Sequence, residues 1–218
     1  MKKIIVSSLF LGIVLMAKSQ NLSLGPVVGI NHSWMTGTGD NKHFNPGLNI
    51  GGTVTYSFNP SWGVGGDLLY TMEGVKRRTE GNTVVNTRDA NLNFIRIQPK
   101  LIHFFGDLGD AVRPKLFVGG SVGFLVGGNT ETTISTNNES ADIATKVKSK
   151  DLYNNVDAGV FAGAGINWRI GKATWLNTDL VYNNGLVDLS KSDNSWQASR
   201  GVAFNLGVTF PIGTVNPQ

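Results

Sequence analysis

The chain has 218 residues, of which 16% are charged and 28 are glycine, and it contains no cysteine. This length suits one domain, and the absence of cysteine excludes both a disulfide framework and a thiolate metal site. Soluble domains carry roughly 25% charged residues and about half this share of glycine, so the composition favours strands built from small residues.

Residues 1–19 have the pattern of a secretory signal peptide. Lys2 and Lys3 precede an apolar run over residues 4–17, and Ala17 and Ser19 have the spacing of a cleavage site. The run is shorter than the about 20 residues that a membrane-spanning helix needs. Without Lys2, Lys3 and Lys18 the 19 basic residues become 16, against 15 acidic residues. We therefore expect a cleaved signal and a nearly neutral mature domain, residues 20–218, with no affinity for nucleic acid.

Eight segments of the mature chain alternate between large apolar side chains and small or polar ones. They span residues 22–35, 47–58, 62–74, 92–105, 112–126, 153–170, 175–186 and 201–212. In the third segment, Trp62, Val64 and Leu68 alternate with Gly63 and Asp67. A period of two residues predicts β-strands with two unlike faces.

The connections between these segments alternate in length. Short connections at residues 59–61, 106–111 and 171–174 alternate with long polar ones at 36–46, 74–91, 127–152 and 187–200. Short periplasmic turns and long extracellular loops are typical of outer-membrane barrels.

The apolar faces are too bulky to point inward. An eight-stranded barrel has an interior barely wide enough for ordinary side chains, whereas each strand carries about five large apolar ones. With the apolar face outward, the strands meet lipid, and Gly, Ser, Asn and Asp fill the lumen. The sequence therefore predicts an all-β fold, an eight-stranded antiparallel up-and-down transmembrane β-barrel, integral to the outer membrane. The alternative is a soluble lipocalin-like barrel.

Charged residues occur on the predicted lumen face and would need partners there. If Trp62 lies opposite Phe105, Asp67 falls opposite Lys100, and Glu73 lies one diagonal step from Arg96. We expect an internal ion-pair network that plugs the barrel, comprising Asp67, Glu73, Arg96, Lys100, Arg113, Lys115, Asp157 and Asp179. The alternative is that water solvates each charge separately.

Two motifs and the strand layout carry a family resemblance. The motifs are "IRIQPKLIHFFG" at residues 95–106 and "YNNGL" at residues 182–186. Together with the eight-strand layout they resemble the small outer-membrane β-barrel proteins of the Bacteroidota, the PorT-like or porin family group. The resemblance implies an eight-stranded barrel, usually without a known activity. Two features depart from the group: Val181 stands where relatives often have Arg, and eight residues follow the last aromatic, Phe210.

No arrangement of residues indicates catalysis, a cofactor or a metal site. His32 and His103 share the lipid-facing parity near strand ends, and His43 lies in the first long loop, so the three form no site. Ser33 must point to the face opposite His32. Trp196, in the fourth long loop, could stack on carbohydrate or pack on its neighbours. We expect a role in envelope structure or in binding through the long loops.

Three other functions stay open: a narrow porin-like channel, an accessory of a secretion system, and a lipid-modifying enzyme. The expected partners are outer-membrane lipid, the barrel-assembly machinery during insertion, and an extracellular ligand of unknown identity.

Overall fold

The computed structural model describes residues 22–36, 42–43, 45–80, 84–107, 109–136, 139–192 and 196–212. The predicted signal peptide, residues 1–19, and His43's side chain lie outside the described part of the protein.

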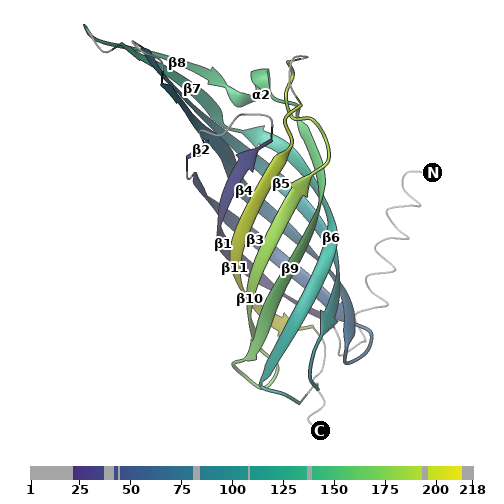
Figure 1. The fold of residues 1–218 in the computed structure, drawn as a ribbon. Coiled ribbons are helices and arrows are strands. Elements are labelled where there is room, and N and C mark those ends of the chain that lie inside the picture. Colours follow the sequence, from purple (N-terminus) through teal and green to yellow (C-terminus); the bar gives the residue numbers. More distant parts are fainter. Residues whose placement is uncertain are drawn as a thin grey trace, which may run out of the picture.

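Eight strands form a closed antiparallel barrel (Figure 1). The strands are β1 (Leu22–Met35), β3 (Pro46–Ser57), β4 (Trp62–Glu80), β5 (Val84–Phe104), β6 (Val112–Gly127), β9 (Val156–Arg169), β10 (Trp175–Gly185) and β11 (Ser199–Pro211). Each strand pairs with its neighbours along the chain, and the pairing of β1 with β11 closes the sheet. The prediction of an eight-stranded antiparallel barrel is confirmed.

The apolar faces point outward, as the alternation predicts. Ile30, Leu68 and Val118 are each more than half exposed on the outer wall, at 60%, 58% and 53%. Their chain neighbours Asn31 and Leu69, which have the opposite parity, are buried in the lumen. An outer wall of large apolar side chains is suited to lipid and not to water.

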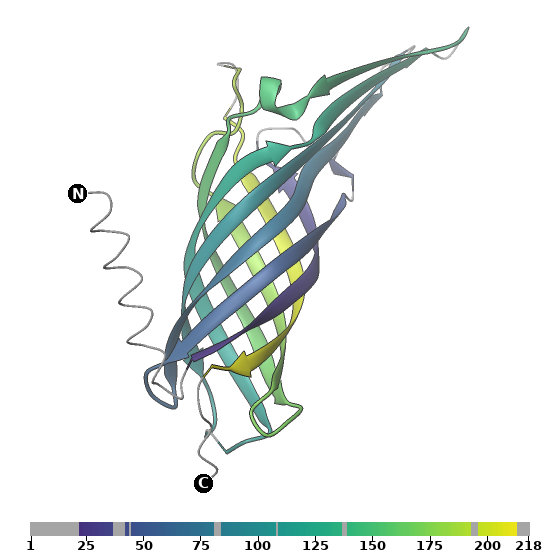
Figure 2. The ribbon, with the colours of Figure 1, turned by 180° about the vertical axis from the view of Figure 1, so that it is seen from behind.

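One end of the barrel, the upper end in Figure 1, continues into a projecting sheet. Here β4 and β5 run on beyond the barrel, β2 (Lys42–His43) pairs with β4, and β7 (Asn129–Thr136) pairs with β5 and with β8 (Glu139–Lys148). Both views show this sheet leaving the barrel obliquely (Figure 2). We call it the upper sheet.

The upper sheet corrects the prediction of long polar loops at residues 74–91 and 127–152. These segments are largely strands, and the helix α2 (Ser149–Leu152) follows β8. Outside a membrane neither face of a strand has to be strictly apolar, so the alternation that identifies the barrel strands is absent. None of the described helices is long and apolar enough to cross a membrane.

The predicted register between β4 and β5 is wrong by two residues. Trp62 lies opposite His103 and not opposite Phe105, so Asp67 lies opposite Gln98. A shift of two residues keeps every side chain on its own face, so the polarity pattern cannot detect it.

Candidate functional site

A three-residue charge cluster occupies the upper half of the lumen. The Arg96 guanidinium contacts Glu73 through Nε–Oε1 at 2.5 Å and Nη2–Oε2 at 2.7 Å, and it contacts Asp157 through Nη2–Oδ2 at 2.6 Å. The side chains of Arg96 and Asp157 are 8% and 1% exposed. These contacts link β4, β5 and β9. Separating them would leave a buried charge without a countercharge, which is costly.

Polar side chains from β4, β6 and β11 hydrogen-bond to this cluster. Ser199 donates a hydrogen bond to Asp157 at 2.7 Å, and Thr71 donates one to Glu73 at 2.8 Å. Arg96 also donates to the Ser121 hydroxyl, at 3.3 Å. Hydrogen bonds from β4, β5, β6, β9 and β11 therefore converge on one level of the barrel, where they leave little room for a passing solute.

Two ion pairs occupy the lower half of the lumen. Lys100 Nζ lies 2.7 Å from Asp67, and Lys115 Nζ lies 2.8 Å from Asp179. The centroid of the Phe117 ring lies 5.4 Å from Lys100 Nζ and 5.8 Å from Lys115 Nζ. Both ammonium groups thus have a carboxylate and an aromatic face as neighbours.

Arg113 stands apart from the other predicted network members. At the lower end it donates to the backbone oxygen of Pro60, and its guanidinium lies 4.9 Å from the Phe104 ring centroid. Among the described residues no ion pair involves Arg113. The structure thus brings together seven of the eight predicted residues, as an upper cluster of three and a lower set of two pairs.

Glycines make room for the large lumen side chains. On β6 and β9, Phe117 lies opposite Gly163, and Phe161 lies opposite Gly119. A Cβ atom on Gly163 would lie 2.3 Å from Phe117, and one on Gly119 would lie 2.7 Å from Phe161. Large and glycine residues therefore alternate across the strand pair, so that the narrow lumen is filled without overlap.

The lumen also contains apolar side chains, which differs from the expectation of Gly, Ser, Asn and Asp alone. One buried cluster comprises Ile102, Phe104, Phe117, Phe161, Val181 and Ala203. Phe117 and Phe161 have the lumen parity in the sequence, which is the signal that could have located them. The prediction rested on the faces with about five large apolar residues, which form the outer wall, and not on single aromatic residues of the other parity.

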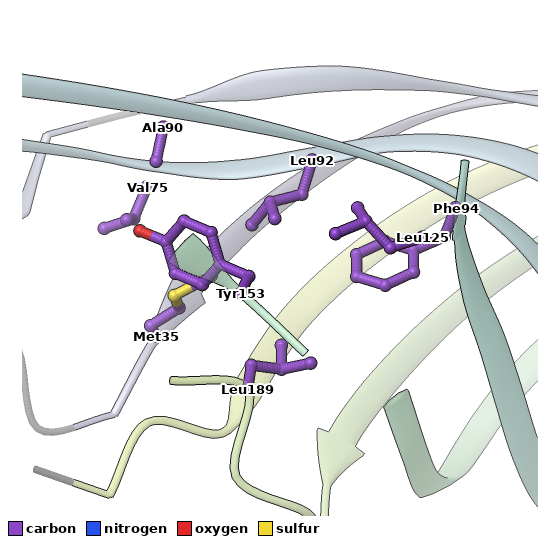
Figure 3. Close-up of a cluster of buried hydrophobic side chains, with 8 residues drawn as sticks. All are labelled: Met35, Val75, Ala90, Leu92, Phe94, Leu125, Tyr153 and Leu189. Carbon is purple, nitrogen blue, oxygen red and sulfur yellow. The ribbon is translucent and has the colours of Figure 1, made fainter. Parts of the chain in front are cut away.

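A second apolar cluster closes the upper end of the lumen (Figure 3). It contains Met35, Val75, Ala90, Leu92, Phe94, Leu125, Tyr153 and Leu189, and we call it the cap. The Tyr153 ring lies among Val75, Met35 and Leu92 (Figure 3). Burial raises the pKa of the Tyr153 phenol, and a hydrogen bond and charge from Arg88 partly offset this. Several cap residues lie in segments that the sequence assigned to loops, so the cap was missed.

Two small cavities lie within the lumen. One, of about 30 Å³, is lined by Glu73 and Arg96 among others, and one, of about 20 Å³, is lined by Lys100 and Asp179 among others. A cavity must have a volume of at least about 10–15 Å³ to hold one water molecule, so each of these cavities has room for one or two waters.

The remaining candidates from the sequence stay apart. Ser33 is buried and donates to the backbone oxygen of Gly74, whereas His32 lies on the opposite face beside Trp34. His103 packs against Trp62 and Phe105 on the outer wall. The structure does not bring a serine and a histidine together at these positions.

Comparisons with known proteins agree with this geometry. A family model described as "Outer membrane protein beta-barrel domain" matches residues 17–191. A search of curated protein sequences gave no match.

The fold is similar to that of several solved structures. Neisserial surface protein A is 14% identical, with 87% of this chain and 96% of that chain covered and a TM-score of 0.49. OprG from Pseudomonas aeruginosa is 10% identical, with 91% and 99% covered and a TM-score of 0.48. Outer membrane protein W from E. coli is 14% identical, with 89% and 98% covered and a TM-score of 0.44.

Proposed function

Because this chain belongs to the family of outer-membrane β-barrel domains, we propose that it is a plugged, non-conducting barrel that anchors a binding sheet at the cell surface. The barrel fixes the protein in the outer membrane, and the upper sheet faces the extracellular medium. Binding by the upper sheet, with no catalysis, is the function that this arrangement supports best.

The filled lumen is the observation that carries the proposal. It contains the cap at the upper end, then the cluster around Arg96, and below this the two lysine pairs interleaved with the apolar cluster around Phe117. Cavities of about 30 and 20 Å³ hold one or two waters each and not a hydrated ion. Opening a path would require several buried ion pairs to separate, and each separation is costly.

The exposed position of the upper sheet supports a binding role. Its strands continue β4 and β5 without a break, so the rigid barrel holds the sheet in a fixed direction. Residues 76–79 and 143–146 are exposed on it. Binding residues are commonly found on segments that a rigid scaffold positions.

Ion conductance of the purified mature protein tests the plugged lumen. Reconstituted in planar bilayers, the protein should give no discrete conductance steps, and neither should the matched outer-wall variant Ile97→Ala. Migration of unboiled samples on gels verifies that the barrel has folded in both. Discrete conductance steps from the folded protein would refute the proposal and favour the narrow channel.

A finer assignment is part of the same proposal. The motifs at residues 95–106 and 182–186 support placement in the PorT-like group of the Bacteroidota, with a cleaved signal peptide at residues 1–19. A deletion strain with normal envelope integrity but a loss of protein secretion would favour a secretion accessory over a binding role.

A further inference from the structure

Two arginines lie directly opposite each other on the upper sheet. Arg77 of β4 pairs with Arg88 of β5, and both are exposed. Directly opposite residues of antiparallel strands share a face, and like charges in that position destabilise a sheet. The fold therefore tolerates an unfavourable pair at this position, and an anion bound between the two would remove the repulsion.

The face that carries this pair can be identified from the cap. Val75 lies two residues before Arg77, and Ala90 lies two residues after Arg88. The two lie directly opposite each other, and both are buried in the cap. Arg77 and Arg88 therefore point to the same side, above the closed mouth of the barrel and away from lipid. The charge of Arg88 also acts to lower the pKa of the Tyr153 phenol, so the pair lies near the top of the cap.

The arginine pair is part of a row over the four strands β4, β5, β7 and β8, and Lys42 of the short strand β2 lies opposite Arg77 at the end of this row. Arg88 lies opposite Thr132 of β7, and Thr132 lies opposite Thr145 of β8. Neighbouring strands are about 4.8 Å apart, so the row is roughly 14 Å long. It presents two guanidinium groups followed by two hydroxyl groups.

The two faces of the upper sheet differ in charge. On the opposite face, the adjacent row contains Lys76, Asp89, Glu131 and Lys146, with ion pairs Lys76–Asp89 at 3.8 Å and Lys146–Glu131 at 3.2 Å. On the face of the arginine row, every second residue in four described ranges contributes its side chain: Val75 to Thr79, Asn86 to Ala90, Thr130 to Ile134 and Ile143 to Val147. None of the residues that share the parity of Arg77, Arg88, Thr132 and Thr145 in these ranges is Asp or Glu. The charges are balanced within one face and unbalanced on the other.

We propose that the row Arg77–Arg88–Thr132–Thr145 binds an acidic polysaccharide at the cell surface. Planar guanidinium groups bind carboxylate or sulfate through two parallel hydrogen bonds. Threonine hydroxyls both donate to and accept from sugar hydroxyls. An extended chain with acidic and neutral hydroxyl-bearing sugars matches a linear row of this composition. This inference rests on the proposed binding role of the upper sheet.

Binding to immobilised polysaccharides tests the inference. The mature protein in lipid nanodiscs is passed over heparin, which carries sulfates, over polygalacturonate, which carries carboxylates, and over neutral dextran. We expect binding to at least one acidic polysaccharide and none to dextran, and the stronger of the two distinguishes sulfate from carboxylate.

Two double variants with the same change in charge serve as a matched pair. Arg77→Gln with Arg88→Gln should weaken binding by roughly tenfold or more, because charge-assisted hydrogen bonds are lost. Lys76→Gln with Lys146→Gln, on the opposite face of the same sheet, should change it by less than about twofold, because the distance from the row leaves only screened long-range attraction. A gel shift on boiling verifies that both variants fold.

Two results would overturn the inference. Equal weakening by the two double variants would mean that general electrostatic attraction, and not this row, binds the polysaccharide. If the barrel does not conduct and binds neither acidic polysaccharide, the inference about the arginine row is wrong and the plugged-barrel proposal stands. If the wild-type protein conducts ions, the plugged-barrel proposal is wrong, and polysaccharide binding can still be measured separately.

Discussion

At the level of single residues, the role of glycine in this barrel depends on the face on which it lies. Gly119 points into the lumen, where a Cβ atom would lie 2.1 Å from the backbone oxygen of Pro99 and 2.7 Å from Phe161. Its neighbour Gly120 points outward, with nothing within 4 Å of such an atom. The same residue type is required by packing at one position and free of any packing constraint at the next.

Substituting these two glycines separately tests this difference. Gly119→Ala should lower the free energy of unfolding by about 1–3 kcal/mol, because overpacking displaces Phe161 or the backbone of β5. Gly120→Ala should leave it unchanged or raise it by up to about 1 kcal/mol, since alanine restricts the unfolded chain. Urea unfolding in lipid vesicles measures both, and equal effects would mean that the lumen has space to spare.

The charged residues of the lumen show how far the sequence reaches at this level. Asp67 and Lys100 were expected directly opposite each other, and they meet at 2.7 Å from diagonal positions instead. Parity, which the sequence shows, places both on the lumen face. The register depends on the hairpin in which Glu80 lies opposite Val85, and that hairpin falls in a segment without alternation.

A double-mutant cycle tests the coupling of Asp67 and Lys100. Asp67→Asn alone should lower the free energy of unfolding by about 3–5 kcal/mol, because it leaves the Lys100 ammonium buried without a countercharge. Asp67→Asn with Lys100→Met should lower it by at least about 1 kcal/mol less than the sum of the two single effects. Additive effects of the two substitutions would show that the side chains do not interact.

At the level of elements, the strands that cross the membrane were predictable and those above it were not. Lipid on one side and a narrow lumen on the other impose alternation, and the predicted bounds of β1, at residues 22–35, equal the observed ones. In β4 the alternation ends after Gly74, where Lys76, Arg77 and Arg78 follow one another. Both faces of the upper sheet carry polar residues, so its strands have the composition of loops.

The cap includes residues from segments outside the strands. Leu189, between β10 and β11, is 0% exposed in the cap, whereas Leu186 nearby is 55% exposed. Leu189→Ala should lower the free energy of unfolding by about 2–5 kcal/mol through lost burial and a cavity. Leu186→Ala should cost less than about 1 kcal/mol. Similar losses from both variants, measured by urea unfolding, would mean that the cap does not pack as a core.

At the level of the whole molecule, closure of the sheet determines whether the barrel is stable in lipid. Every barrel strand has two hydrogen-bonded neighbours, which leaves no backbone edge to meet hydrocarbon. The number of barrel strands and the outward apolar face follow from alternation and could be predicted. The charged residues of the lumen could be named and Glu73 was expected near Arg96, but the contact of Arg96 with Asp157 of β9 could not be predicted, because parity does not show which non-neighbouring strands meet across the lumen.

Two deletions of equal length separate closure from overall size. A chain without residues 199–218 lacks β11, so β1 and β10 each expose an edge, and it should lose the shift in gel migration between boiled and unboiled samples that a folded barrel gives. A chain without residues 129–148 lacks β7 and β8, which pair with each other and, through β7, with the upper part of β5. Its new ends are already adjacent, since Ser149 N donates to Gly128 O at 3.0 Å. This second chain should keep the shift and stay in the membrane after carbonate extraction. Loss of the shift in both chains would mean that the upper sheet, and not closure alone, is needed for the barrel to fold.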